Sequence, residues 1–208
     1  CIQAVVGGQA GELRVGHGLR NQYQRDGNAG DDIGAQRRAV AQFRREKLDV
    51  ESRQLMGAAQ ERWMAGELAG SKARGQAWQV LAQQIVISPQ SAPPEMLNYL
   101  PPGMPAGGRR WFEEGVQVSA LGLPWNLDAW GGYPKARERF IAACASQGSN
   151  ALVLAGDSHN CWVSNVPASA GGRLAAVEFA GGSVTSPGFE SSLTNAQPGQ
   201  REASMRGA

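Results

Sequence analysis

A short apolar run that ends abruptly in polar residues is the feature that most constrains the fold of this chain. Residues 151–155 carry only apolar side chains, and Asp157, His159 and Asn160 follow directly after Gly156. An apolar run of this length is typical of a strand that is buried on both faces. In open α/β sheets, ligands bind just beyond the carboxyl ends of such strands. The run therefore predicts a buried strand and a functional site immediately after it.

Asp157 and His159 are two residues apart at that point, so both side chains can lean to one side of the turn. Together they offer a hard oxygen donor and a nitrogen donor, a combination that suits a metal site. The same stretch also fits an ordinary turn, because Asp and Ser side chains bond to their own backbone in turns. On these residues alone the two interpretations carry equal weight. The chain's other histidine is His17, so a histidine-rich zinc site within this chain is excluded.

The rest of the chain predicts an α/β order of helices and strands. Periodicity and turn residues predict a helix over 52–69, a strand over 78–87, a helix over 134–147, and a hairpin of 161–166 with 174–180. The apolar face of the first helix consists of Leu55, Ala59, Trp63, Met64 and Leu68. The segment 161–166 also fits a helix, and both assignments stay open. Residues 88–124 hold seven of the eleven prolines, so we expect a long irregular segment, interrupted by a short helix around 110–114.

The two ends of the chain do not resemble the ends of a complete protein. Residues 1–42 are rich in Gly, Gln, Arg and Ala and show no helical or strand periodicity, so they remain unassigned. A disordered lead-in, a divergent segment and an aberrant stretch of sequence all fit them. Residues 191–208 form a polar tail. We therefore expect the chain to be a fragment of a longer protein.

Composition excludes several classes of function. The net charge of +2 is too small to indicate nucleic-acid binding. No apolar stretch approaches the roughly 20 residues that span a bilayer, and no basic segment followed by an apolar one marks a signal peptide. Three cysteines do not form a disulfide framework. Cys144 lies within the predicted helix 134–147, where it is expected to be a small core residue.

Five sequence blocks in a fixed order resemble one known family. They are Gln60-Glu-Arg-Trp63, Trp78-Gln-Val80, Asp128-Ala-Trp-Gly-Gly-Tyr133, Gly156-Asp-Ser-His159, and Glu178-Phe179 ahead of Ser183 and Ser186. In this order and spacing they are similar to the carboxyl-terminal half of the alkaline phosphatase D family, the PhoD-like phosphatases. The resemblance runs from about Phe43 to Glu190. It divides the chain into an unassigned segment 1–42, a phosphatase part 43–190 and the tail.

The resemblance implies a fold and an activity. The fold is the carboxyl-terminal half of a metallophosphatase-like αββα sandwich, an α/β structure with a mixed sheet and flanking helices. The implied activity is metal-dependent hydrolysis of small phosphate esters, by a phosphatase or phosphodiesterase that is secreted or periplasmic. The implied cofactors are Ca²⁺ and Fe³⁺, and most of their ligands come from the half of the domain that precedes the matched part. We therefore expect the chain to need that half as a partner and to be inactive alone.

The resemblance also assigns site residues. It makes Asp157 and His159 catalytic metal ligands, with a phosphate contact as an alternative for His159. Asn160 orients His159 or bonds a phosphate oxygen, although a turn-capping role fits it equally well. Asp128, Trp130 and Tyr133 are implied to line the substrate mouth.

Purely structural roles also fit some residues of this region. Asp128 also fits as a cap of the helix that starts at Pro134. Gly131 stands where the family commonly has an acidic residue, so no role is assigned to that position. Arg137 and Arg139 are expected to be solvated surface residues.

Two other functions start from the same residues. Gly156-Asp157-Ser158 also occurs in GDS-type serine esterases, in which the serine is the nucleophile and needs a base within hydrogen-bond reach. No histidine follows His159 in this chain, so that base is missing. A non-catalytic remnant that acts as a binding module is the other alternative.

Overall fold

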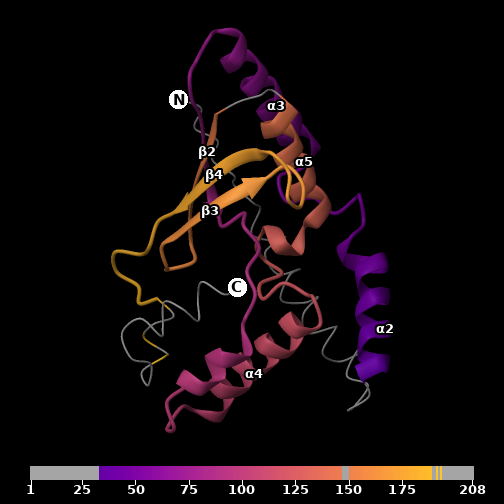
Figure 1. The fold of residues 1–208 in the computed structure, drawn as a ribbon, viewed down its shortest axis with the longest axis vertical. Helices are drawn as coiled ribbons and strands as arrows, with labels where there is room; N and C mark the ends of the chain where they lie inside the picture. Colours follow the sequence, from indigo (N-terminus) through magenta and orange to yellow (C-terminus); the bar gives the residue numbers. More distant parts are fainter. Residues whose placement is uncertain (1–32, 147–149, 189–190, 192, 194–208) are drawn as a thin grey trace.

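The apolar run 151–155 forms the second strand of a four-stranded sheet (Figure 1). The structure is a computed structural model, and it describes residues 33–146, 150–188, 191 and 193. The strand order is β1-β2-β4-β3, with β1, β2 and β4 parallel and β3 antiparallel to β4. The predicted α/β class, with a mixed sheet and flanking helices, is confirmed. The described residues contain one sheet, which is one layer of the expected sandwich.

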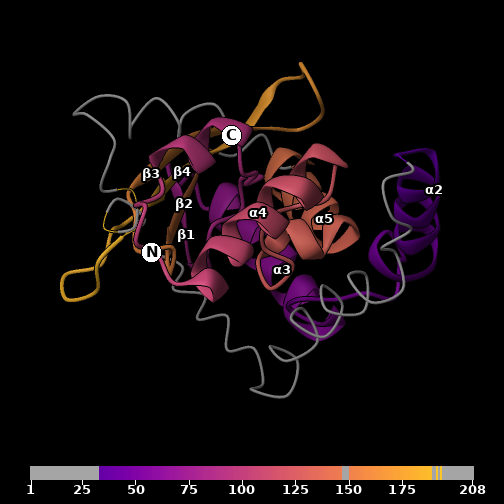
Figure 2. The same cartoon turned by 90° about the horizontal axis from the view of Figure 1, so that it is seen from below.

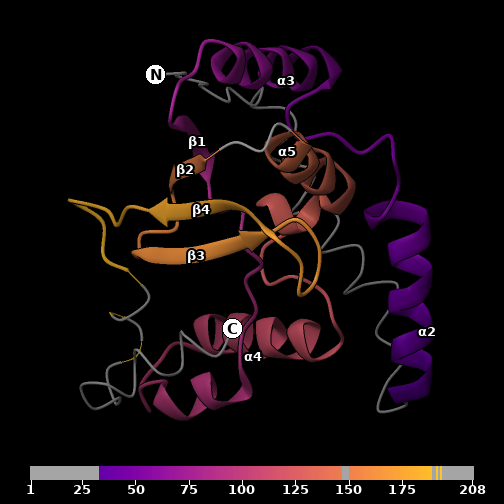
Figure 3. The same cartoon turned by 45° about the horizontal axis from the view of Figure 1, so that its top comes forward.

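The elements follow one another in a mixed order. The strands are β1 (Gln79–Ile85), β2 (Ala151–Gly156), β3 (Trp162–Pro167) and β4 (Leu174–Ala180). The α-helices are α2 (Ile33–Phe43), α3 (Ala58–Ala73), α4 (Ala106–Ala120) and α5 (Pro134–Ser146). A π-helix η1 (Arg44–Leu48) and two 3₁₀-helices, η2 (Pro94–Tyr99) and η3 (Trp130–Gly132), complete the set. Of the two assignments left open for 161–166, the strand is confirmed: β3 and β4 pair directly as an antiparallel hairpin (Figure 3), and the turn between them places Gly171 at φ +67°.

Parallel pairing brings three strand ends to one edge of the sheet. Ile85 pairs with Gly156, and Ala155 pairs with Ala180, so β1, β2 and β4 all end at the same level. The segments that follow these strands must therefore leave the sheet side by side. This carboxyl edge is where α/β sheets bind ligands.

Helices α3 and α5 cover one face of the sheet and form the main core with it. Phe140, Ile141 and Cys144 of α5 are buried, as the helical spacing predicted, and Val153 of β2 packs beneath them. Burial of each large apolar side chain contributes about 1.5 to 3 kcal/mol. Burial also raises the pKa of the Cys144 thiol to about 12, so this cysteine is a protonated core residue, as expected.

Helix α3 begins later than its sequence pattern predicted. The predicted start at residue 52 is wrong, because Gly57 adopts φ +82°, which a right-handed helix cannot contain. The helix starts at Ala58, whose N–H donates to the side chain of Gln54 at 3.1 Å. Trp63 is 44% exposed, so the apolar face of the helix is narrower than predicted and is formed by Met64 and Leu68.

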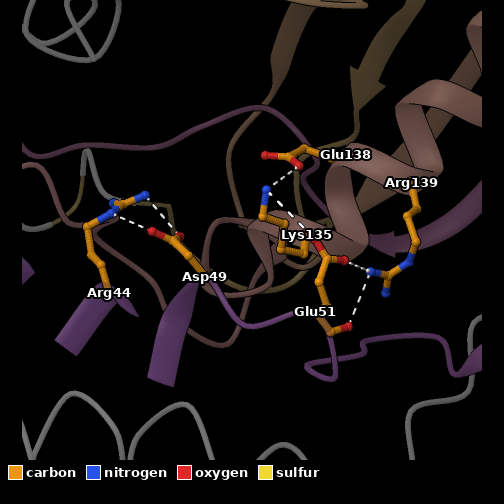
Figure 4. Close-up of polar contacts among 6 residues, drawn as sticks. All are labelled: Arg44, Asp49, Glu51, Lys135, Glu138 and Arg139. Atoms are coloured by element: carbon orange, nitrogen blue, oxygen red, sulfur yellow. Dashed lines mark hydrogen bonds and ion pairs between the residues drawn. The ribbon is translucent and has the colours of Figure 1, made fainter. Parts of the chain in front are cut away.

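Charged side chains attach α3 and the segment before it to α5. Figure 4 shows the contacts of Glu51, in that segment, with Lys135 and Arg139. Arg139 donates to both carboxylate oxygens of Glu61, at 2.7 and 3.0 Å, and to Glu51 at 3.4 Å. These hydrogen bonds to Glu61 raise the pKa of Arg139. Lys135 binds Glu138 at 2.9 Å, which raises the pKa of the lysine. Arg139 is therefore half-buried and paired, and the expectation of a solvated surface residue is wrong for it.

The segment 88–124 is not irregular, and this prediction is also wrong. Its prolines lie outside α4 or at the start of a helix: Pro94 is the first residue of η2, and Pro105 is immediately before the first residue of α4. The helix runs for 15 residues, three times the length of the short helix expected around 110–114. Phe112 of α4 packs with Trp125, which follows the helix, in a separate small core. The number of prolines in 88–124 predicted an irregular segment, although the residues between Pro105 and Pro124 form the amphipathic helix α4.

The prediction that residues 1–42 form no regular element is wrong for their last part. Residues 33–43 form α2, and its side chains Val40 and Phe43 pack against Val118 and Leu127. Residues 1–32 lie outside the described part of the chain, as does most of the predicted tail.

The second face of the sheet is open and apolar. Leu154, Phe179 and Val163 face each other across β2, β4 and β3, and they are 40%, 45% and 70% exposed. Figure 2 shows the labelled helices on the other side of the sheet. The expectation that β2 is buried on both faces is therefore wrong for this structure. Contiguous exposed apolar side chains of this kind mark interaction surfaces.

We expect the open face to drive self-association of the chain. The double variant Val163→Thr, Phe179→Thr should lower the associated fraction in sedimentation velocity, because it removes exposed apolar surface and keeps residues that suit strands. Val166→Thr on the same strand is the matched control. Val166 is 1% exposed, so its new hydroxyl should cost about 1 to 3 kcal/mol of unfolding free energy. Association of the double variant equal to that of the wild type would contradict the prediction.

Candidate active site

The turn after β2 holds two non-glycine residues in the left-handed region. Asp157 has φ +62° and His159 has φ +59°, and both side chains are exposed. The N–H of Ser158 donates to the carbonyl of Gly156 at 2.8 Å, which closes a tight turn at the end of the strand. Left-handed backbone costs a non-glycine residue about 1 to 2 kcal/mol. Such conformations gather at functional sites, where the surrounding structure holds them in place.

Hydrogen bonds of Ser158 hold this turn together. Its hydroxyl donates to the carbonyl of Asn160 at 3.0 Å and accepts from the indole N–H of Trp162 at 3.0 Å. Asn160 is buried at 8% exposure beside the exposed His159. Because the Ser158 proton goes to a backbone carbonyl, the hydroxyl is not paired with a base. This arrangement argues against the serine-esterase alternative.

A backbone carbonyl fixes the orientation of His159. The imidazole Nδ1 lies 3.2 Å from the carbonyl oxygen of Pro187. A carbonyl only accepts, so Nδ1 carries the proton in this contact and Nε2 carries the lone pair. Histidines that bind metals are held in this way, with one ring N–H donated to a carbonyl or carboxylate. In the neutral imidazole this orientation leaves the Nε2 lone pair available to a cation.

Asp157 and His159 fit part of a metal site. They supply an exposed carboxylate and an oriented imidazole at the carboxyl edge of the sheet. Within the described residues, no group of three or more His, Cys, Asp or Glu side chains lies close enough to hold a metal ion. Protein metal sites use three or more ligands as a rule. The described carboxylate, imidazole and thiol groups at this turn would therefore supply two ligands of such a site.

The segment with Asp128, Trp130 and Tyr133 lies directly before α5. Trp130 is 1% exposed and donates from its indole to Gln83 of β1 at 2.9 Å. Tyr133 is buried in the same core, while Asp128 is half-buried and donates its backbone N–H to Asn126 at 2.8 Å. The structure therefore places both aromatic rings in packing positions. Whether these three residues contact a substrate stays a prediction.

Gly131 departs from the family pattern for a visible reason. A Cβ at this position would lie 2.8 Å from the ring of Pro124. A side chain there would have to displace the proline. The missing carboxylate is therefore compatible with the local packing of this chain.

Arg53 is a residue that the sequence analysis did not identify. Its Nε donates to the carbonyl of Gly132 at 2.6 Å, and its guanidinium lies 4.2 Å from the centre of the Tyr133 ring. Burial lowers the pKa of Arg53, while Tyr133 and Asp128 act in the opposite direction. Arg53 therefore anchors the Asp128–Tyr133 segment. No local pattern signals this, because the partners are 79 residues apart in sequence.

Glu178 and Arg137 form hydrogen bonds with the backbone of Ile87 and Ser88, the segment that follows β1. The fully buried carboxylate of Glu178 accepts from the backbone N–H groups of Ile87 at 2.6 Å and Ser88 at 3.0 Å. Arg137 donates to the carbonyl of Ile87 at 2.6 Å, so the expectation of a solvated arginine is wrong here too. Burial lowers the pKa of Arg137, opposed by the charge of Glu178. These contacts fix the end of β1 beside the turn that holds Asp157.

Comparison with known proteins agrees with this geometry. A family model described as PhoD-like phosphatase matches residues 20–207. The chain belongs to the PhoD-like phosphatase family. The resemblance found in the sequence is therefore confirmed, and the match starts ahead of Phe43, where the sequence blocks began.

A PhoD-like relative is alkaline phosphatase D of Bacillus subtilis (strain 168). It is 32% identical over 141 residues, which cover 66% of this chain and 19% of that protein. The chain therefore matches about a fifth of the length of this relative. No solved structure matches the chain. Among the described residues, no helix is both long and apolar enough to cross a membrane.

The family model and the relative are both described as phosphatases, a class of hydrolase that acts on phosphate esters. The two exposed donors of the turn after β2 agree with that class.

We expect Glu178 to be a large contributor to stability. Glu178→Ala should lower the free energy of unfolding by about 3 to 5 kcal/mol, because the N–H groups of Ile87 and Ser88 lose their acceptor and half-buried Arg137 loses a nearby opposite charge. Glu178→Gln keeps one acceptor oxygen and should cost about 1 to 2 kcal/mol. Glu138→Ala, at an exposed ion pair of α5, is the control and should cost less than about 1 kcal/mol. Urea denaturation measures all three, and equal losses for Glu178→Ala and Glu138→Ala would refute the role of Glu178.

Proposed function

We propose that this chain carries part of the active site of a metal-dependent enzyme that hydrolyses phosphate esters, with Asp157 and His159 as metal ligands. The observation that carries the proposal is the turn after β2. Its two potential ligands keep left-handed backbone at the carboxyl edge of a parallel sheet, and a carbonyl orients the imidazole. Family membership supports the same class of reaction.

The donor set suits the metals that the family resemblance implies. The Asp157 carboxylate is a hard oxygen donor of the kind that Ca²⁺ takes, and the His159 imidazole is a nitrogen donor suited to iron. Bound cations supply charge stabilisation for phosphate esters, whose negative charge otherwise repels a nucleophile. We therefore propose Ca²⁺ and Fe³⁺ as cofactors, with Asp157 and His159 as two of their ligands.

The substrate in this proposal is a small phosphate mono- or diester. Asn160 either holds His159 in place or donates its amide to a phosphate oxygen, and its burial beside His159 supports both roles. Asp128, Trp130 and Tyr133 approach the substrate from the segment before α5. The burial of both aromatic rings means that they would shape the wall of the site.

The partner in this proposal is further polypeptide of the same domain. The open apolar face of Leu154, Val163 and Phe179 suits a second sheet packed on it, as in two-layer sandwiches. The match to about a fifth of the Bacillus subtilis relative agrees with a larger functional unit. That second layer would bring the metal ligands that Asp157 and His159 lack. Secretion, implied by the family resemblance, completes the proposal.

We predict that the 208-residue chain is inactive or nearly so by itself, because two donors do not complete a metal site. The test is release of p-nitrophenol from p-nitrophenyl phosphate and from bis(p-nitrophenyl) phosphate, with Ca²⁺ and Fe³⁺ present. If the purified chain hydrolyses either substrate measurably, and His159→Ala abolishes that hydrolysis, the prediction of an inactive chain is wrong.

Metal retention tests the two ligands directly. In a protein that also carries the rest of the domain, Asp157→Ala and His159→Ala should each lower the iron and calcium that remain after dialysis by more than about tenfold, the scale expected when a metal shell is disrupted. His17→Ala removes the chain's other histidine and is the matched control, which should keep its metal. Elemental analysis measures the metals. If neither turn variant lowers the metal content relative to His17→Ala, the assignment of the ligands is wrong.

A further inference from the structure

Residues 181–187, here called the strap, follow β4 and return to the turn that holds His159 (Figure 1, yellow segment). We infer that the strap orients the His159 imidazole and that Ser183 is the positioning residue that shapes it. The consequence for a metal rests on the proposed function, whereas the orientation itself does not. The sequence blocks included Ser183 without a role.

The start of the strap is attached on both sides of the turn. The N–H of Gly181 donates to the carbonyl of Ala155 at 2.9 Å, just before the turn. The N–H of Gly182 donates to the sulfur of Cys161 at 3.2 Å, just after it. A Cβ at Gly182 would lie 3.0 Å from that sulfur and 3.7 Å from the carbonyl oxygen of His159. An alanine here would therefore have to push the Cys161 sulfur or the strap aside by a few tenths of an ångström.

Ser183 then bends the strap back toward His159. Its hydroxyl oxygen accepts from the N–H of Thr185 at 3.3 Å and from the N–H of Ser186 at 2.8 Å. Such serine turns reverse the chain over a few residues. The next residue is Pro187, and its carbonyl lies 3.2 Å from His159 Nδ1. The hydroxyl of Ser183 therefore sets the direction from which that carbonyl reaches the imidazole.

Burial does not fix the shape of the strap. Residues 181–185 are exposed, and Val184 is exposed completely. The described hydrogen bonds, together with the fixed φ of Pro187, are what hold the carbonyl in place. Removing the Ser183 hydroxyl should therefore release the orientation of His159 without disturbing the core.

The tautomer of His159 reports this orientation in the metal-free protein. A free imidazole favours the Nε2–H tautomer, whereas the Pro187 carbonyl requires Nδ1–H. Long-range ¹H–¹⁵N spectra of the 208-residue chain distinguish the two forms, at a pH well above the ordinary imidazole pKa of about 6.5. The chain has two histidines, so His17→Gln assigns the signals. The wild type should show His159 as Nδ1–H.

Substitutions in the strap give the decisive comparison. Ser183→Ala removes the acceptor of two backbone N–H groups, and it should lower the ratio of Nδ1–H to Nε2–H at His159 by about fivefold, the effect of losing the single exposed hydrogen bond from His159 to the Pro187 carbonyl. Ser183→Thr retains a hydroxyl and should restore the wild-type ratio. Ser186→Ala keeps the backbone N–H that Ser183 accepts, so it should leave the ratio unchanged. Gly182→Ala is a second variant that should displace the strap and shift the ratio in the same direction as Ser183→Ala.

The outcomes separate this inference from the proposed function. An Nε2–H tautomer in the wild type, or a ratio that neither Ser183→Ala nor Gly182→Ala changes, overturns the role of the strap, whatever the metal content of Asp157→Ala. A ratio that shifts in both variants supports the role of the strap. If metal content then stays the same in His159→Ala, the orientation stands and the ligand assignment fails.

Discussion

Parallel pairing of β2 with β1 and β4 is the constraint on which the arrangement of the site depends. Because parallel strands end at the same edge, the segments after Ile85, Gly156 and Ala180 emerge together. The first is held by Glu178 and Arg137, the second is the turn with Asp157 and His159, and the third is the strap. Three stretches far apart in sequence thus form one local structure.

The chain uses charged side chains for two different purposes. Near the surface, Lys135 and Arg139 attach Glu51, in the segment before α3, to α5, and such pairs with an exposed partner contribute little individually. Inside, Glu178 satisfies backbone N–H groups that would otherwise be buried without acceptors, and this is a requirement rather than a small gain. The buried contacts act on the carboxyl edge of the sheet, so stability and site geometry depend on the same residues.

The two faces of the sheet follow different rules. The face under α3 and α5 is closed by large apolar side chains, while the face with Leu154, Val163 and Phe179 is open. A uniformly apolar run such as that of β2 is typical of strands covered on both faces. The difference between this pattern and the observed exposure is the physical basis for proposing a partner on the open face.

The sequence by itself determined the strand at β2, the turn with Asp157 and His159, helix α5 and the family, and it left the β3–β4 hairpin as one of two assignments. These features are encoded in contiguous residues, through period, turn chemistry and ordered blocks. Helix α2 escaped prediction because it follows a glycine-rich stretch, and α4 was predicted too short because prolines surround it. Only the tertiary structure decided the roles of Arg53 and Glu178 and the orientation of His159. Each depends on a backbone group distant in sequence, and no local pattern encodes such a contact.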